Sequence, residues 1–346
     1  MKRSELRYPS ADGANCIRAL VWEPDAVAAG APPRAVVQLV HGMAEHVERY
    51  ERFAGVLCEA GYAVCAEDHV GHGKTAATAE DLGHIPLAHG VDVLLEDMHA
   101  LRCRVCSRYE ERAARAVDAS ARQDAGQDIS QSASQNPPSP LVGEVPYVLF
   151  GHSLGSFMVR VYLARWGEGV SAAVVCGTGQ QPRWLVRAGN ALCHVLACVR
   201  GERYRSALVD SLAVGAYGRA IKHARTPQDW LSYDGAVVDA YRADPCCGFM
   251  FTVGGYAAVT ALASASQDVA LASGIPRDVP LLFIAGADDP VGDCGAGVHR
   301  AVAQYRRLGM AQVDEIIYDG MRHEILNESD HERVERDVLA WLEAHV

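Results

Sequence analysis

A serine stands between two glycines at the point where an apolar run gives way to a helical pattern. Residues 151–155 read Gly-His-Ser-Leu-Gly and directly follow the apolar run 147–150. A turn this tight between a strand and a helix leaves room only for glycine beside the serine, and it forces the serine into a strained backbone conformation. The hydroxyl of Ser153 would then project above a sheet at a helix N-terminus. We therefore interpret Ser153 as a nucleophile rather than as a helix-capping serine.

Two carboxylates and a histidine follow later strands in the order that such a nucleophile requires. A serine hydroxyl reacts once a base removes its proton, and in sites of this kind the acid and then the histidine follow the serine in sequence. Asp288 and Asp289 come directly after the apolar run 281–285, and His323 comes after the run 313–318. Open α/β sheets build their active sites at the carboxyl ends of strands. We predict His323 as the general base and one of the two aspartates as its partner.

The same chemistry requires two backbone N–H groups that stabilise the negatively charged oxygen of a tetrahedral intermediate. One donor should be the residue after the nucleophile, Leu154, and the other should come from the loop that follows an early strand. Residues 40–43, Val-His-Gly-Met, form that loop at the end of the apolar run 35–40. The sequence therefore predicts an oxyanion hole made by the N–H groups of Met43 and Leu154.

These candidate residues need a sheet that brings the ends of several strands together. Continuous apolar runs are typical of parallel strands buried on both faces, and helical patterns separate most of the runs. Strands that alternate with helices predict an α/β fold with a mostly parallel sheet and helices on both faces. An Asp-Gly turn signal between two N-terminal runs predicts a hairpin. The expected strands are 5–8, 17–22, 35–40, 62–66, 147–150, 172–176, 281–285 and 313–318, and the expected helices are 47–60, 92–114, 155–166, 296–308 and 330–344.

Two segments interrupt this alternation. Residues 118–140 are rich in Ser, Gln and Pro, so we expect a disordered surface insertion. Residues 180–270 show helical patterns without a clear strand, which predicts a helical cap inserted into a catalytic domain made of residues 1–179 and 271–346. Segment 184–199 of the cap carries an apolar stripe, which we expect to pack on the sheet domain, with contact to lipid as the alternative. The stripe consists of Leu185, Ala188, Leu192, Val195, Leu196 and Val199.

Composition excludes several classes of protein. The 346 residues are 49% hydrophobic, and 32 Lys and Arg against 43 Asp and Glu give a net charge of −11. Such a chain is globular rather than disordered or fibrous, and its acidic balance argues against nucleic acid as a partner. The eleven cysteines and the absence of an export-type apolar segment near residue 1 lead us to expect reduced thiols and a cytoplasmic location. No run of 18 apolar residues is present that could span a membrane.

Taken together, these motifs resemble the α/β-hydrolases of the monoacylglycerol lipase and lysophospholipase group, which is also described as serine aminopeptidase-like. The resemblance covers nearly the whole chain except residues 115–143. It implies an eight-stranded α/β-hydrolase sheet with residues 180–270 as a lid over an acyl pocket. It also selects Asp289 over Asp288, because the acid of the family ends a G-x-x-D motif. The matching segments are 41–50 (HGMAEHVERY), 68–74 (DHVGHGK), 151–155 (GHSLG), 229–232 (DWLS), 244–245 (DP), 286–292 (GADDPVG) and 322–328 (RHEILNE).

The resemblance implies a serine ester hydrolase that acts on monoacylglycerol or lysophospholipid-like esters through an acyl-enzyme. Its catalytic triad would be Ser153, His323 and Asp289. Two alternatives share this triad: a carboxylesterase for short or aromatic acyl groups, and a serine aminopeptidase-like peptidase. A third alternative is a non-catalytic binding protein on the same fold.

No cofactor and no metal is expected. Neither the pair His41 and His46 nor the pair His69 and His72 has the H-E-x-x-H spacing of a zinc-binding helix. The expected partner is a small lipid or ester substrate, with peripheral membrane contact through the lid and no nucleic acid. The sequence leaves the oligomeric state open.

Overall fold

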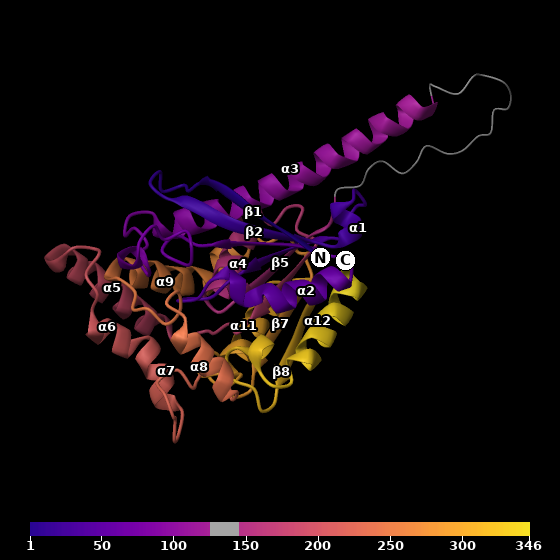
Figure 1. Ribbon diagram of the computed structural model, residues 1–346. Helices are drawn as coiled ribbons and strands as arrows, with labels where there is room; N and C mark the ends of the chain where they lie inside the picture. Colours follow the sequence, from indigo (N-terminus) through magenta and orange to yellow (C-terminus); the bar gives the residue numbers. More distant parts are fainter. Residues whose placement is uncertain (125–144) are drawn as a thin grey trace.

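One sheet of eight strands, in the order β1-β2-β4-β3-β5-β6-β7-β8, forms the centre of the computed structural model (Figure 1). The structure describes residues 1–124 and 145–346, with side chains for residues 1–112 and 145–346. β1 pairs antiparallel with β2 and β2 with β4, whereas all other neighbouring strands are parallel, which confirms the predicted mostly parallel α/β-hydrolase sheet. The strands are β1 (Lys2–Pro9), β2 (Cys16–Glu23), β3 (Val36–Val40), β4 (Ala63–Asp68), β5 (Tyr147–His152), β6 (Ala172–Cys176), β7 (Leu281–Gly286) and β8 (Val313–Tyr318).

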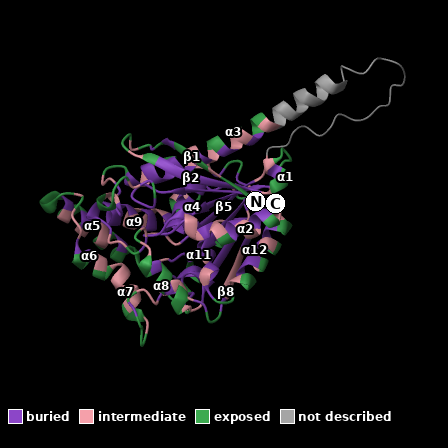
Figure 2. Ribbon diagram, in the orientation of Figure 1, coloured by how far each residue is buried: buried purple, intermediate pink, exposed green. Residues whose placement is uncertain are grey.

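Both faces of the sheet are buried at the central strands β3 to β7, which explains why the sequence of these strands is mostly apolar. In β3, Val36 and Val40 belong to the hydrophobic cluster on one face, and Val37 and Leu39 belong to the cluster on the other. Figure 2 shows the central strands as buried between layers of helices. The helices before β6 and after β7 are α1 (Asp25–Ala28), α2 (Glu51–Glu59), α3 (Gly90–Asp124), α4 (Leu154–Trp166), α11 (Ala296–Arg307) and α12 (His331–His345), with the short 3₁₀ helices η1 (Val47–Tyr50), η2 (Ala79–Asp81) and η3 (Ile325–Asn327).

Helix α3 is longer than the sequence pattern predicts. The expected helix over residues 92–114 continues to Asp124, so residues 118–124 of the expected insertion are helical. Residues 111–124 include several alanines and arginines, which are strong helix formers, and this propensity accounts for the extra turns. The remainder of the expected insertion, residues 125–140, lies outside the described residues.

Six helices without a strand occupy the chain between β6 and β7, where the sequence predicts a cap. Helix α9 contacts both α4 and α5 and thereby connects this segment to the sheet layer. The division into a catalytic domain and a cap with boundaries at 180 and 270 stays a prediction. The six helices are α5 (Arg183–Arg200), α6 (Ala207–Leu212), α7 (Val214–Ala220), α8 (Gly235–Ala243), α9 (Val253–Ser266) and α10 (Val269–Ala272). Among all described residues, none of the helices is long and apolar enough to cross a membrane.

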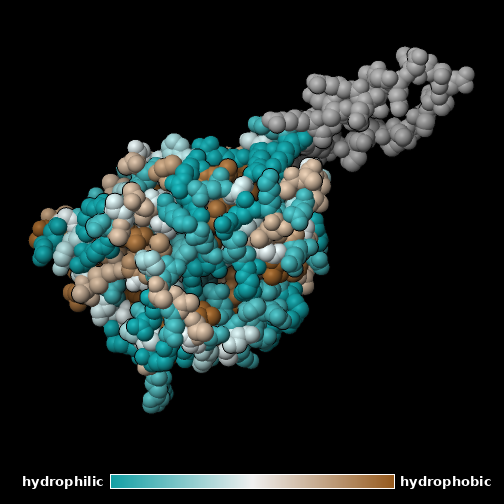
Figure 3. Space-filling view, viewed as in Figure 1, coloured by the Kyte–Doolittle hydropathy of each residue, from teal (hydrophilic) through white to brown (hydrophobic). Residues whose placement is uncertain are grey.

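Only part of the apolar stripe of α5 packs on the core as expected. Val195 is 61% exposed and Val199 is 74% exposed, whereas the buried residues of the helix are Val186, Cys193 and Ala197. The expectation holds for Leu192 and Leu196, which are half-buried against the main hydrophobic core, and is wrong for Val195 and Val199, which face outward because α5 packs on α9 with its other side. Figure 3 shows hydrophobic residues on the surface beside α5 and α6.

Candidate active site

Ser153 forms the turn between β5 and α4 in a backbone conformation that L-residues rarely adopt, with φ 54° and ψ −116°. Glycine is required on both sides of the serine because other backbone atoms lie too close to leave room for a Cβ atom. A Cβ atom at Gly151 would lie 2.3 Å from the carbonyl oxygen of Gly155, and a Cβ atom at Gly155 would lie 2.0 Å from that of Val40. Strain of this kind costs about 1–3 kcal/mol and is concentrated at functional sites. The predicted strand–turn–helix geometry around the serine is therefore present.

His323 and Asp289 are joined by a hydrogen bond of 2.9 Å between Nδ1 and Oδ2. Both side chains are almost fully buried, and the other carboxylate oxygen of Asp289 accepts a hydrogen bond of 2.8 Å from the N–H of Val291. Asp288, the neighbouring candidate, instead accepts a hydrogen bond of 3.0 Å from the hydroxyl of Tyr233. The geometry thus pairs the histidine with Asp289 rather than with Asp288.

Four of the five predicted site residues line a single cavity of about 540 Å³, namely Met43, Ser153, Leu154 and His323. Asp289 lies behind His323 and has no exposed surface. The Ser153 hydroxyl makes no hydrogen bond to any described residue, so the serine and the histidine share the cavity without a direct bond. Hydrogen bonds of this kind are often long in ligand-free enzymes and shorten when substrate binds.

The loop after β3 presents the other part of the site. Among the described residues, the N–H groups of Met43 and Leu154 donate no hydrogen bond, so both are available to an oxyanion. This loop packs closely on the serine turn, since a Cβ atom at Gly42 would lie 3.0 Å from the Cβ of Ser153. The N–H of Gly42 donates a hydrogen bond of 2.5 Å to Glu45, which fixes the course of the loop.

A buried network of charges connects this loop to the loop of His323. Arg49 donates to Glu45 at 2.8 Å and to both carboxylate oxygens of Glu324 at 2.7 Å. Burial alone would raise the pKa of Glu45, but its hydrogen bond with His152 and the charge of Arg49 hold this pKa well below the usual range. Burial lowers the pKa of His152, but the hydrogen bond and charge of Glu45 outweigh it and raise that pKa. Because Glu324 follows His323, the network positions both loops relative to each other.

Three buried histidines support the loop from its other side. The rings of His41 and His69 stack at 3.9 Å, and the ring of His72 lies 5.0 Å from that of His41. Burial and the neighbouring histidine His69 lower the pKa of His41 well below its usual value. Burial likewise lowers the pKa of His72 to about 3. The imidazoles of His41 and His72 are therefore neutral near pH 7, and all three rings pack against one another.

The sequence reasoning missed Arg49, Glu324 and Trp230 as parts of the site. The ring of Trp230 lies 5.0 Å from that of His323 and helps to fix its orientation. Arg49 and Glu324 carried a usable signal, because each stands next to or within a motif that also holds a predicted site residue. Trp230 carried a weaker signal, because it lies in the family-like segment 229–232, which holds no predicted site residue and is almost a hundred residues from the histidine.

Comparison with known proteins agrees with this geometry. A sequence model of the family described as serine aminopeptidase, S33, matches residues 31–330. A monoacylglycerol lipase of Mycolicibacterium smegmatis is 27% identical over 99% of this chain and 98% of its own length. The crystal structure of a thermostable carboxyl esterase from Bacillus coagulans in complex with glycerol has a TM-score of 0.81 and 28% identity, with coverage of 100% of this chain and 99% of the other.

A more distant structure shares the fold alone. A monoglyceride lipase from Saccharomyces cerevisiae has a TM-score of 0.70 at 16% identity, over 99% of this chain and 95% of the other. The family match covers most of the chain, including every predicted site residue. The chain therefore belongs to the serine aminopeptidase S33 family of α/β-hydrolases and is a hydrolase similar to monoacylglycerol lipases and esterases.

Proposed function

We propose that this chain is a serine ester hydrolase for monoacylglycerol or lysophospholipid-like esters, with Ser153, His323 and Asp289 as its catalytic triad. The observation that carries the proposal is the buried hydrogen bond of 2.9 Å between His323 and Asp289, at the wall of the cavity that Ser153 lines. A carboxylate on Nδ1 fixes the tautomer of the imidazole, so that Nε2 is free to accept a proton.

In the proposed reaction, His323 takes the proton of the Ser153 hydroxyl while Oγ attacks the ester carbonyl. The N–H groups of Met43 and Leu154 donate to the carbonyl oxygen as it becomes negative, and Asp289 stabilises the imidazolium. The imidazolium then protonates the leaving alcohol, and the acyl group stays on the serine. A water molecule, deprotonated by the same histidine, attacks the acyl-enzyme and releases the carboxylic acid.

The lining of the cavity supports a lipid as the substrate. Apolar side chains from α4, α5 and α9 surround most of the space, and its volume of about 540 Å³ is within the usual range for small-molecule sites. An acyl chain would fit this lining better than a charged peptide. The relative from Mycolicibacterium smegmatis, named a monoacylglycerol lipase, supports the same choice. Apolar residues in the lining include Phe157, Leu185, Leu192, Val259, Ala263 and Val291.

Activity on a chain-length series of nitrophenyl esters, together with a monoacylglycerol and an aminoacyl amide, tests this proposal. We expect kcat/KM to rise with acyl length and the monoacylglycerol to be cleaved, whereas Ser153→Ala should be inactive. The surface variant Ser273→Ala is the control and should behave as the unmodified enzyme. Highest activity on the aminoacyl amide would contradict the choice of ester substrate and favour a peptidase.

A carboxylesterase for short or aromatic acyl groups is the second candidate. It is favoured by the 28% identical carboxyl esterase from Bacillus coagulans, whose structure aligns over the full chain. The same ester series distinguishes the two candidates, because a carboxylesterase should give its highest kcat/KM with short chains. The triad and the oxyanion hole would be the same in both.

We also propose that the exposed face of α5 and α6 contacts lipid surfaces. Trp184, Val199 and Leu208 are each more than half exposed, which is unusual for large apolar side chains. Two of them flank the part of α5 that lines the cavity, so the same helix would contact lipid on one side and substrate on the other. The cytoplasmic location expected from the cysteine content stays a prediction.

A further inference from the structure

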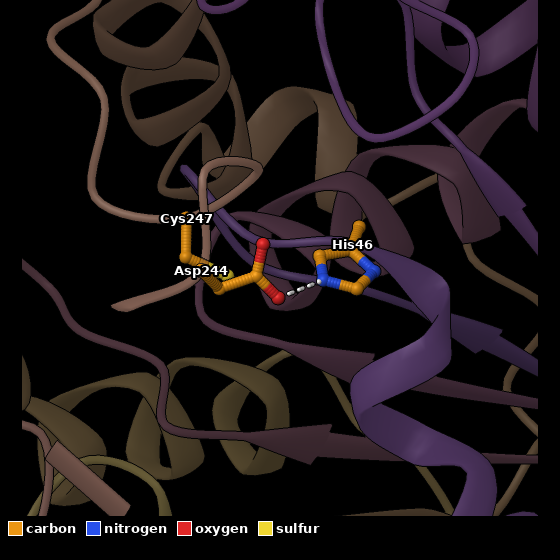
Figure 4. A group of neighbouring side chains, drawn as sticks. All are labelled: His46, Asp244 and Cys247. Atoms are coloured by element: carbon orange, nitrogen blue, oxygen red, sulfur yellow. Dashed lines mark hydrogen bonds and ion pairs between the residues drawn. The ribbon is translucent and has the colours of Figure 1, made fainter. Parts of the chain in front are cut away.

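A histidine, an aspartate and a cysteine meet where the loop after β3 contacts the segment between α8 and α9 (Figure 4). His46, Asp244 and Cys247 each offer one ligand atom, and these atoms all lie within 4.8 Å of one another. His46 comes from the loop of the candidate oxyanion hole, whereas the other two lie about 200 residues later. As a metal ligand, His46 was paired in sequence only with His41, whereas the structure places His41 against His69 and His72.

The chemistry of these three side chains suits a borderline divalent metal. Imidazole nitrogen, thiolate sulfur and carboxylate oxygen are the ligands that zinc takes in proteins. Among the described residues, the thiol of Cys247 makes no hydrogen bond; its side chain is buried in a small hydrophobic cluster with Leu231 and Tyr241. We propose that His46, Asp244 and Cys247 bind a zinc-type divalent cation, a site separate from the candidate triad.

Small movements of the three side chains would bring their ligand atoms into tetrahedral coordination of a zinc ion. A tetrahedral zinc ion with bonds of about 2.0–2.3 Å separates its ligand atoms by roughly 3.3–3.8 Å, so movements of about 1 Å are enough. The side chain of Asp244 is 33% exposed, which gives an ion an entry path and leaves a fourth position for water. The loop and the turn already lie together, since the N–H of Gly248 donates to the carbonyl of Ala44 at 3.0 Å.

Protons must leave the site when the metal binds. His46 Nε2 and Asp244 Oδ2 share a hydrogen bond of 2.9 Å, so the Nε2 proton has to move before that nitrogen can ligate. The proton would move to Nδ1, which lies 3.8 Å from Glu48 Oε2, and this distance must shorten for a hydrogen bond to form. The thiol of Cys247 would release its proton to solvent when the metal binds.

Glu48 would act as the outer partner of the ligating histidine. Such a carboxylate orients the ring and raises its basicity, and its loss typically lowers metal affinity by about 10–100-fold. The other carboxylate oxygen of Glu48 accepts hydrogen bonds of 2.9 Å from both Arg18 and Lys74, which hold the side chain in place beside the ring. An occupied site would join the loop of Met43 to the turn after α8.

Binding of Co²⁺ to metal-free, reduced protein tests this proposal directly, because a thiolate-to-cobalt charge-transfer band reports the sulfur ligand. We expect one equivalent of Co²⁺ to produce this band and Zn²⁺ to remove it by competition. Cys247→Ser should lose the band, and Glu48→Gln should weaken Zn²⁺ binding about 10–100-fold. Cys198→Ser, which changes an exposed thiol on α5, is the matched control and should bind as the unmodified protein.

Three outcomes would overturn the site. They are the absence of a charge-transfer band in the unmodified protein, a band that persists in Cys247→Ser, and a band that is lost equally in Cys198→Ser. His46→Ala removes a hydrogen bond that also supports the loop, so its circular dichroism is recorded beside its Zn²⁺ titration. The measurement needs no substrate and can be repeated in Ser153→Ala, so its result does not depend on the proposed esterase reaction.

Discussion

The loops at the carboxyl edge of the sheet bury paired charges, whereas the helices between β6 and β7 expose apolar side chains. At the sheet edge, Glu45, Arg49 and Glu324 are buried charges that satisfy one another through several hydrogen bonds. On the outer helices, Val195 and Val199 expose apolar surface to solvent. A polar network that is fully paired fixes positions, whereas a thin apolar layer can shift at little cost. We therefore expect the sheet edge to be rigid and the outer helices to be adaptable.

The largest effect should come from the rigid edge. Asp289→Asn leaves the volume unchanged but removes the charge that fixes the tautomer of His323, so we expect kcat to fall on the order of 10⁴-fold. Asp288→Asn is the matched control, because the carboxylate of this neighbour accepts a hydrogen bond from Tyr233 and makes none with His323 among the described residues. Ester hydrolysis by both variants checks the assignment. Equal losses in the two variants would show that the hydrogen bond of 2.9 Å does not identify the acid.

Loss of the Arg49 charge from the network with Glu45 and Glu324 should lower the stability of the fold as well as the catalytic rate. Arg49→Met leaves two buried carboxylates without a cation, and we expect the free energy of unfolding to fall by about 3–5 kcal/mol. Urea denaturation measures this change. Arg225→Met, which breaks an exposed pair with Asp239 in the outer segment, should leave the unfolding midpoint unchanged. If the two variants lost the same stability, the contrast between the two regions would fail.

Acid should weaken the rigid edge through its neutral histidines. Burial lowers the pKa of His72 to about 3, so between about pH 3 and 6.5 the unfolded chain binds the extra proton and stability rises with pH. For this group alone, lowering the pH from 7 to 5 should cost roughly 2 kcal/mol of unfolding free energy. His72→Gln should reduce that pH dependence, and exposed His194→Gln should not. Urea unfolding at pH 7 and pH 5 measures this dependence. If the unfolding free energy of His72→Gln depended on pH as strongly as that of the unmodified protein, His72 would not be the group responsible.

The smallest effect on stability should come from the exposed stripe. Val199→Ser removes apolar surface that is already in solvent, so the unfolding free energy should change by less than about 0.5 kcal/mol. Val186→Ser on the same helix buries a hydroxyl and should cost about 2 kcal/mol. Sedimentation with phospholipid vesicles adds a second readout. Binding should weaken in Val199→Ser, and undiminished binding would argue against lipid contact at this face.

Much of the fold could be predicted from the sequence because local pattern and tertiary burial agree there. The runs 147–150 and 281–285 are apolar at every position, and the run 35–40 at every position but Gln38, since both faces of the sheet are covered there. The stripe of α5 misled the prediction, because an apolar helix face looks the same in sequence whether a sheet, a lipid or solvent covers it. Only the packing of α5 on α9 distinguishes these cases.

The part of the candidate site that lies within one short motif could be predicted from the sequence. Gly151, Ser153 and Gly155 act within a single turn, so their spacing is diagnostic. The pairing of His323 with Asp289 rather than Asp288 could not be derived from spacing alone, because neighbouring positions differ by less than the uncertainty of a loop. Contacts between remote segments, such as His46 with Asp244, have no local signature and appear only after folding.

Covalent labelling with a fluorophosphonate, followed by proteolysis and mass spectrometry, tests the central claim most directly. The claim is that the strained turn and the buried His323–Asp289 pair make Ser153 the nucleophile. The account predicts one adduct on Ser153 in the folded protein, and none after denaturation or in Ser153→Ala. An adduct on another residue, or an unlabelled Ser153 in folded protein, would contradict it.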